Sequence, residues 1–339
     1  MSDLTDFVQE QQESNELRAA LRRSQAALVK EKARNLELAE EVYRAAKDAA
    51  IAIGKPEPVT KLATDRRRGR EEVALIHLTD WQLGKRTESY NTEVCIERVM
   101  DCASRVRKIN AVQRHDHPVR RAVVLFGGDM VEGVNIFPGQ PFEIDSTLYT
   151  QLFACTNLMQ RLIRELLADV ETVEVWGEYG NHGRLGRKKG GEYPASDNID
   201  SIAYQIAADA LKPEKRVVWH PRGSWHQIVT VGAYRAMLIH GDEVQGFGGQ
   251  TPAYGLLRKG NAWASGVVEP FQDIFFGHYH THLELSLSNG GMMYGTGSPE
   301  SDNLYAQEFV AAKGKPSQRL HYINAATGIT TAQYRLYLG

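Results

Sequence analysis

The sequence predicts an α/β protein built from two stacked sheets with helices on their outer faces. Between residues 72 and 211, short apolar runs typical of strands alternate with longer segments of helical periodicity. From residue 216 onward, short strand-like runs separated by glycine turns predominate. Helix and strand alternation followed by a strand-rich region is typical of two packed sheets flanked by helices.

The apolar patterns assign the elements in chain order. In the first part, strands are expected at residues 73–79, 122–127 and 172–176, and helices at 91–113, 145–168 and 197–211. In the second part, strands are expected at 216–219, 225–231, 234–239 and 273–276, with further short strands between 283 and 338. Nothing repeats at a fixed period, so a repeat architecture is not expected.

A separate long helix is expected before this domain, over residues 13–53. Apolar residues recur in it at alternating intervals of four and three, which is the pattern of a coiled coil, and Gly54 and Pro56 end it. The narrow apolar stripe needs a partner. We favour a homo-oligomer formed through this helix, and docking onto the chain's own domain is the alternative. The expected organisation is a coiled-coil segment at 1–54, a basic linker at 55–71 and a globular domain at 72–339.

Composition places the chain among soluble globular proteins. Of its 339 residues, 42% are hydrophobic and 24% are charged, which is enough to bury a large core. Cys95, Cys102 and Cys155 fall in helical segments without a metal or redox spacing, so we expect reduced core cysteines in a cytoplasmic protein. No apolar run approaches the ~18 residues of a membrane span. The net charge of −2 neither requires nor excludes a polyanionic partner.

Residues of metal-binding types follow five of the predicted strands. They are Asp80 and Gln82 after the first strand, Asp129 after the second, Asn181 and His182 after the third, His240 after residues 234–239, and His278 and His280 after 273–276. In open α/β sheets, functional groups gather beyond the carboxyl ends of the strands. We therefore expect these five strand ends to converge on one metal site.

Each of these residues has an ordinary structural explanation when taken alone. The aspartates suit turns or helix N-caps, Asn181 suits a left-handed turn, and a His-x-His pair is common in exposed loops. Five such motifs in one chain are much less common, so the metal site is the stronger hypothesis. Of the other histidines, His77 and His226 are expected in the core or on the surface, and His282 is a candidate neighbour of the site.

The ordered set Asp-x-Gln, Gly-Asp, Gly-Asn-His, His and Gly-His-x-His resembles the calcineurin-like metallophosphoesterase superfamily, over roughly residues 73–300. The runs at 78–84 and 297–302 look most like phage-encoded members called exonucleases, which are distant relatives of double-strand-break repair nucleases. The resemblance implies a four-layer α/β/β/α sandwich of two mixed sheets with the metal ions at one edge. For a phage-encoded protein, it also implies action in the host cytoplasm.

The resemblance further implies two divalent metal ions and a ligand set for each. Asp80, Gln82, Asp129 and His280 would hold one ion, and Asp129, Asn181, His240 and His278 would hold the other. A hydroxide bridging the two ions would attack phosphorus, and His182 would protonate the leaving oxygen.

Two positions depart from the family pattern. Gln82 stands where the family commonly has histidine, and Gly183 stands where an acidic residue often follows the third motif. An amide oxygen is a harder and weaker ligand than imidazole, so we expect Mn²⁺ to be preferred, with Mg²⁺ or Zn²⁺ as alternatives. The other interpretation is an inactive relative that holds one metal ion.

The expected substrate is DNA, cleaved by exonuclease action. Four basic residues follow His182 among glycines, a composition suited to a phosphate backbone; they are Arg184, Arg187, Lys188 and Lys189. The arginines at 66–70 are expected to be solvated surface. Two alternatives stay open: a phosphodiesterase or phosphatase for small substrates, and a non-catalytic oligomeric DNA-binding protein. Because no helix trails the predicted sandwich, we expect no ATPase to dock as it does in the repair nucleases.

Deleting residues 1–54 tests the expected self-association. The shortened chain should fold and have a smaller oligomeric mass, because the apolar stripe is lost with the segment. Its members are Leu17, Leu21, Leu28, Leu38 and Val42. Light scattering on the full and shortened chains measures this mass. An unchanged mass would favour docking of the helix onto its own domain.

Overall fold

The computed structural model describes residues 59–60, 63–134, 136–137, 139–185, 197–221, 224–244, 252–300 and 315–339. All of them belong to one compact unit, Ile53–Gly339. The helix expected at 13–53 and the basic residues Arg187, Lys188 and Lys189 lie outside the described residues. Self-association through that helix therefore stays a prediction.

The first sheet has six strands in the order β11-β10-β1-β2-β3-β4. They are β1 (Glu72–Leu78), β2 (Arg121–Phe126), β3 (Thr172–Gly177), β4 (Val217–Trp219), β10 (Ser317–Asn324) and β11 (Ile329–Tyr337). Strands β1 to β4 are parallel, while β10 and β11 add an antiparallel edge. Every residue of β1 is buried, as its nearly continuous apolar run predicts.

The second sheet has five strands in the order β5-β6-β7-β9-β8. They are β5 (Gln227–Val231), β6 (Tyr234–Leu238), β7 (Asp273–Phe276), β8 (Leu283–Ser286) and β9 (Met292–Gly295). The central strands β6, β7 and β9 are parallel, and β5 and β8 pair antiparallel at the two edges. Both sheets are therefore mixed, as the expected fold class requires.

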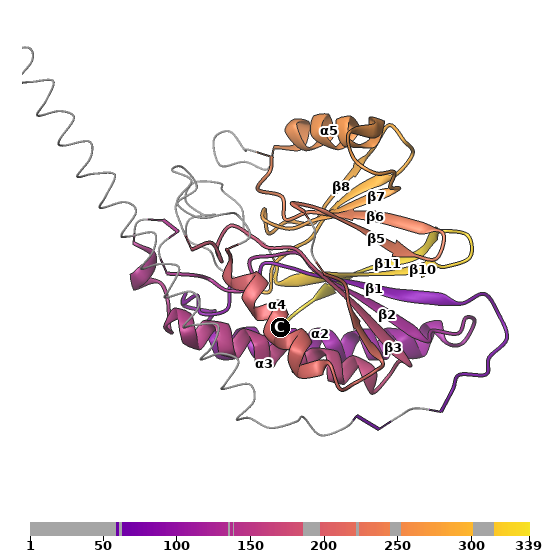
Figure 1. The fold of residues 1–339 in the computed structure, drawn as a ribbon, viewed down its shortest axis with the longest axis horizontal. Helices are drawn as coiled ribbons and strands as arrows, with labels where there is room; N and C mark the ends of the chain where they lie inside the picture. Colours follow the sequence, from indigo (N-terminus) through magenta and orange to yellow (C-terminus); the bar gives the residue numbers. More distant parts are fainter. Residues whose placement is uncertain are drawn as a thin grey trace, which may run out of the picture. The chain divides into compact units, whose positions relative to one another are not determined.

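Helices lie on the outer sides of the two sheets (Figure 1). The first sheet is covered by α2 (Thr92–Gln113), α3 (Leu148–Leu167) and α4 (Ile199–Leu211), and the second by α5 (Ala253–Ala262) with the π-helical turn η2 (Trp263–Val267). A short 3₁₀ helix, η1 (Gln140–Phe142), precedes α3. The expected elements between residues 72 and 239 are all present, so the α/β prediction with two stacked sheets is confirmed.

Helix α5 was not expected from the sequence. Its N-terminus has no side-chain cap, and Gly255 and Gly260 lower its intrinsic helix propensity. The structure shows why a small residue occurs at one of these positions: a Cβ on Gly260 would lie 2.6 Å from Met293 Sδ of β9. Close packing on the second sheet thus stabilises a helix that local propensity does not predict.

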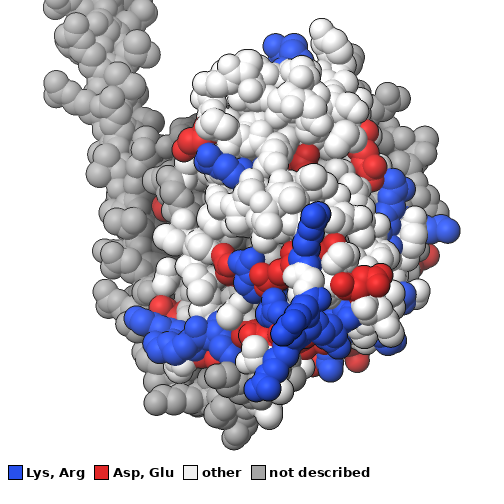
Figure 2. Space-filling view, turned by 90° about the vertical axis from the view of Figure 1, so that its right-hand side faces the viewer, with Lys and Arg blue, Asp and Glu red and all other residues white. Residues whose placement is uncertain are grey.

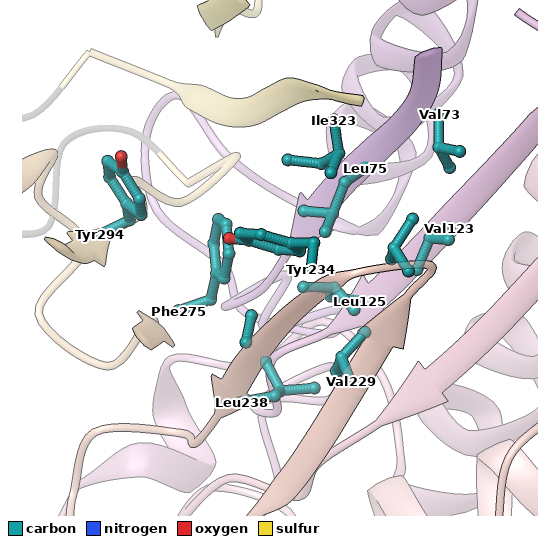
Figure 3. Close-up of a cluster of buried hydrophobic side chains, with 12 residues drawn as sticks. Val73, Leu75, Val123, Leu125, Val229, Tyr234, Leu238, Phe275, Tyr294 and Ile323 are labelled. Atoms are coloured by element: carbon teal, nitrogen blue, oxygen red, sulfur yellow. The ribbon is translucent and has the colours of Figure 1, made fainter. Parts of the chain in front are cut away.

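The core lies between the two facing sheets (Figure 3). Apolar side chains from both sheets interdigitate there; Leu75, Val123 and Leu125 come from the first sheet, and Val229, Leu238 and Phe275 come from the second. Each Å² of apolar surface that is removed from water stabilises the folded chain by about 25 cal/mol. This layer is therefore the main source of stability. It also sets the relative position of the strand ends that carry the site.

The described part of the linker is attached to the edge of the first sheet where its parallel strands begin. Arg120 donates from Nε to Asp65 O at 2.9 Å and from a terminal nitrogen to Arg67 O at 3.0 Å. Glu171 accepts from Asp65 N at 2.8 Å. Figure 2 shows this side of the molecule, where Lys and Arg side chains gather with Asp and Glu among them. Such mixed charge is typical of solvated surface, as expected for the cluster at 66–70.

The cysteines and helices agree with the compositional expectations. Cys95, Cys102 and Cys155 are buried and free, and burial raises the pKa of Cys95 and Cys102 to about 12. Their thiols are therefore protonated packing groups. Among the described residues, no helix has the length and apolar character needed to cross a bilayer.

Candidate metal centre

The predicted residues follow five strands at one edge of the molecule. Asp80 follows β1, Asp129 follows β2, Asn181 follows β3, His240 follows β6, and His278 follows β7. The loops of the two sheets are connected by His278 N, which donates to Asp80 Oδ2 at 2.9 Å. Within the second sheet, Gly277 N donates to His240 O at 2.8 Å. The strand ends therefore meet, as the position of their polar residues predicted.

Three of these side chains already form a compact cluster. Asp129, His240 and His278 each offer a ligand atom, and the three atoms lie within 4.8 Å of one another. His240 Nε2 is 3.1 Å from Asp129 Oδ2 and 3.2 Å from Asn181 Oδ1. The four residues expected to share one ion are thus side by side. We refer to Asp129, Asn181, His240 and His278 as the first half of the centre.

The other predicted ligands are arranged less compactly. His280 Nε2 lies 3.5 Å from Asp80 Oδ1, and Gln82 N donates to Asp129 O at 2.9 Å. The amide oxygen of Gln82 accepts a hydrogen bond from Lys85 Nζ at 3.3 Å. We refer to Asp80, Gln82 and His280, with the shared Asp129, as the second half of the centre.

The chemistry of the first half suits a divalent cation. It combines a carboxylate, two imidazoles and an amide oxygen, which are common ligands of first-row divalent metals. His240 Nδ1 donates to Gly127 O at 2.8 Å, so Nε2 is the nitrogen that faces Asp129. Burial alone would lower the pKa of His240, but the negative charge of Asp129 raises it well above its usual value. Positive charge is therefore favoured at this position.

The main chain of the centre is strained at its predicted ligands. Five described non-glycine residues have a positive φ: Asp80 (54°), Gln82 (42°), Asp129 (52°), His278 (64°) and His280 (51°). Each such conformation costs about 1–3 kcal/mol and persists only where the surrounding structure enforces it. All five are predicted metal ligands, so strain is concentrated at the centre.

A buried carboxylate that the sequence analysis missed holds two of the loops together. Asp200, in the first turn of α4, accepts from Asp129 N at 2.9 Å, Met130 N at 3.1 Å and Gly180 N at 3.0 Å. Burial and the charge of Asp129 raise the pKa of Asp200 to about 6, although the N–H donors oppose this. The local sequence signals only a helix start, with Asn198 as the N-cap.

His182 lies against the first half of the centre. Its main-chain N donates to Asp129 Oδ1 at 2.6 Å, and its Nδ1 lies 2.9 Å from Glu132 O and 3.3 Å from Glu132 Oε2. Burial lowers the pKa of His182, but the charges of Asp129 and Glu132 outweigh this and raise it to about 9. Before an ion binds, the imidazole therefore carries a proton at neutral pH.

Glycines at the centre leave room for the carboxylates. A Cβ on Gly180 would lie 2.0 Å from Asp129 Oδ1, and one on Gly277 would lie 2.3 Å from Asp80 Oδ2. A Cβ on Gly183 would lie 2.2 Å from Asn198 Oδ1. Steric space thus accounts for a glycine at position 183.

His77, His282 and the aromatic neighbour of the first ligand, Trp81, have contacts away from the ligand cluster. His77 is buried beside Thr296, 2.7 Å from Nδ1 to Oγ1, and burial lowers its pKa to about 3. His282 contacts Ser317 Oγ at 3.0 Å and is not part of the ligand cluster. Trp81 is fully buried with its ring edge-on to Phe126.

The last two residues considered from the sequence, His226 and Arg184, are partly exposed. His226 pairs with Glu269 at 3.3 Å. Of the four basic residues expected to bind substrate, Arg184 is described; it is partly buried and forms a main-chain bridge with Asn198. DNA contact by this residue stays a prediction.

Comparisons with known proteins yield structural matches only. No family model matches this chain, and no curated protein matches its sequence. Vps29 from Entamoeba histolytica, solved in complex with Zn²⁺, is 11% identical over 78% of this chain and 99% of that chain, with a TM-score of 0.34. A predicted phosphoesterase from Streptococcus pneumoniae is 11% identical over 79% of this chain and 99% of that chain, with a TM-score of 0.33.

A 5′-nucleotidase from Candida albicans is 10% identical over 81% of this chain and 53% of that chain, with a TM-score of 0.34. Scores of this size do not decide the function of this chain.

Replacing Gly180 by alanine tests the packing of the first half. The new Cβ would displace the Asp129 carboxylate, so we expect Mn²⁺ affinity to fall by about 10–100-fold, as for other residues that support ligands. Calorimetric titration measures the affinity. Gly290→Ala is the control, because Gly290 has a positive φ of 86° in the β8–β9 turn and no atom within 4 Å of an added Cβ. Equal losses in both variants would contradict the prediction.

Proposed function

We propose that this chain is a metal-dependent phosphodiesterase with two divalent metal ions, and that its substrate is DNA. The observation that carries the proposal is the cluster of Asp129, His240 and His278, whose ligand atoms lie within 4.8 Å of one another at the ends of β2, β6 and β7. Asp80 and His280 adjoin it with a second carboxylate and imidazole pair. Such a set is suited to two ions that share one carboxylate.

Asp129 is the residue proposed to bridge the two ions. Its two oxygens have different partners: Oδ1 is 2.6 Å from His182 N, and Oδ2 is 3.1 Å from His240 Nε2. A pair of bound divalent ions would supply an acidified water and would neutralise charge on the phosphoryl oxygens. Carboxylate and amide ligands favour Mn²⁺ or Mg²⁺ over Zn²⁺, and we propose Mn²⁺.

His182 is proposed as the general acid. Its Nδ1 is held by Glu132, so a proton for the leaving oxygen would come from Nε2. Glu132 Oε2, 3.3 Å from Nδ1, is placed to stabilise the protonated imidazole. The protein thus supplies the ligands and the acid, and a protein nucleophile is not required.

DNA is proposed as the substrate because a basic segment follows the acid in sequence. Arg184, Arg187, Lys188 and Lys189 come directly after His182, and a substrate longer than a nucleotide could use them as phosphate partners. We propose exonuclease action. A small phosphodiester is the competing substrate class. The buried free cysteines are consistent with the reducing cytoplasm in which we place this activity.

Two alanine variants separate metal binding from acid catalysis. Asp129→Ala should lose most bound metal and all activity, because both ions lose their shared ligand. His182→Ala should retain metal and lose about 10²–10⁴-fold in rate. Metal content by mass spectrometry and initial rates on DNA measure both effects, with His226→Ala as an unaffected control. Equal metal loss in the two variants would exclude the acid role of His182.

A triple variant tests the DNA substrate. Replacing Arg187, Lys188 and Lys189 by alanine should weaken cleavage of DNA and reduce the slope of log rate against log salt by about one unit per lost phosphate contact. Hydrolysis of a small chromogenic phosphodiester should hardly change. The matched control is the triple replacement of Arg66, Arg68 and Arg70, which removes the same charge at the edge of the first sheet where its parallel strands begin.

Outcomes of this comparison distinguish the substrate classes. Equal loss on both substrates would assign the segment a structural role, and unchanged DNA cleavage would remove the main support for a DNA substrate. Digestion of end-labelled linear DNA with circular DNA left intact is the result expected of an exonuclease. Cleavage of the circle would exclude a strictly exonucleolytic mode.

A further inference from the structure

A buried ion pair lies beside the second half of the centre. Lys85 Nζ is 2.6 Å from Glu300 Oε1, and the two side chains are 7% and 2% exposed. Glu300 Oε2 is 3.1 Å from His280 Nδ1, while Lys85 Nζ also donates to Gln82 Oε1 at 3.3 Å. Lys85 and Glu300 therefore connect two predicted ligands that come from loops of different sheets.

A contribution to the stability of the fold does not explain why this ion pair is buried here. Removing two charges from water costs free energy that their attraction often only balances, and apolar residues of similar size are frequently as stable. The pair is also placed with high specificity, because each partner contacts a predicted ligand. The positions of Lys85 and Glu300 thus point to a role in arranging the second half.

The chemistry of Gln82 indicates what this role is. An amide side chain has an oxygen that accepts hydrogen bonds and an NH₂ group that donates them. An ammonium group can only donate, so Lys85 selects the rotamer in which Oε1 faces it. The opposite atom, Nε2, lies 3.4 Å from His182 Nε2, which can accept a hydrogen bond from it only in the neutral imidazole. A protonated His182 would favour the amide oxygen on its own side, so the Lys85 ammonium is the group that holds the oxygen in the opposite orientation. A metal ion can also bind only the oxygen, so Lys85 and the ion require the same atom of Gln82.

Glu300 keeps Lys85 in place for this interaction. It comes after β9 and its main-chain N donates to Ser298 Oγ at 2.9 Å, while Ser298 Oγ donates to Asp80 O at 2.6 Å. The main chain of Glu300 is therefore linked through Ser298 to the loop that carries Asp80. By contrast, Lys85 has no described contact with Asp129, His240 or His278 of the first half.

We propose that Lys85 is a positioning residue that sets the metal affinity of the second half by holding the Gln82 amide oxygen in place. This inference rests on the proposed metal centre. At this position, where the family commonly has an imidazole, the chain uses an amide whose orientation is ambiguous without a partner. The buried ammonium supplies that partner. The first half, which lacks such a residue, should be independent of Lys85.

Calorimetric titration of the full-length, metal-free chain with Mn²⁺ tests the proposal. Wild-type protein should show a tight and a weaker site. In Lys85→Met, a neutral variant of similar length, we expect the weaker site to lose about 10–100-fold in affinity, as for other residues that support ligands, and the tight site to be unchanged. The tight site thus reports that the variant is folded, and circular dichroism melting provides a second measure of folding.

The same Lys85 substitution, made in a Gln82→Glu variant, separates a positioning role of Lys85 from a merely structural one. Gln82→Glu places an oxygen at both ends of the side chain, so no partner is needed to select one. In that background, Lys85→Met should leave the weaker site unchanged or strengthen it, because a competing positive charge is removed. The effect of the same substitution is therefore expected to disappear or change sign.

Three results would overturn the inference. One is unchanged Mn²⁺ binding in Lys85→Met, and another is an equal loss in the Gln82 and Gln82→Glu backgrounds. A wild-type chain that binds a single ion, with Lys85→Met binding it equally, would also exclude the role of Lys85 while leaving the first half intact. A wild-type chain that binds no Mn²⁺ would instead contradict the proposed function itself.

Discussion

The carboxylate of Asp200 is the constraint on which the candidate centre depends. It is fully buried and accepts main-chain N–H groups from the loop after β2 and the loop after β3. Because these donors belong to Asp129 and Gly180, one side chain determines the distance between the two loops. A neutral side chain at position 200 would satisfy fewer of these donors and leave buried N–H groups unpaired.

Strained backbone conformations and glycines without a Cβ support the same arrangement. The predicted ligands Asp80, Asp129 and His278 adopt left-handed backbone conformations that cost free energy, and the packed sheets behind them compensate for that cost. Glycines at 180 and 277 admit the carboxylates at distances that any Cβ would prevent. The site is therefore preorganised by its surroundings. Preorganised polar groups need little rearrangement when a cation binds, which lowers the free-energy cost of binding.

The two halves of the centre differ in how they are held. In the first half, His240 and Asp129 contact each other directly, and main-chain groups orient them. In the second half, Gln82 Oε1 accepts from the ammonium of Lys85, and His280 Nδ1 contacts the carboxylate of Glu300. The proposed centre should therefore bind its two proposed ions with unequal affinity. The difference originates in Gln82, an amide with two chemically different ends whose oxygen faces the Lys85 ammonium.

The sequence by itself determined the class of fold and the residues that gather at the strand ends. Alternating apolar runs and helical periodicity predict the parallel part of the first sheet, and the polar residue after each run predicts the position of Asp80, Asp129 and His240. These are local patterns, so they can be read without knowing which segments touch. Local patterns did not predict helix α5, because its glycines lower helix propensity and its stability comes from packing on β9.

The tertiary structure alone decided which distant residues support the predicted ligands. Asp200 reads locally as a helix-start residue, and Lys85 and Glu300 read as ordinary charged residues in loops. Their roles arise only when burial removes water and leaves particular partners within hydrogen-bonding distance. A buried charge must be satisfied by groups that the fold brings to it, and sequence spacing does not encode contacts between residues as far apart as Lys85 and Glu300.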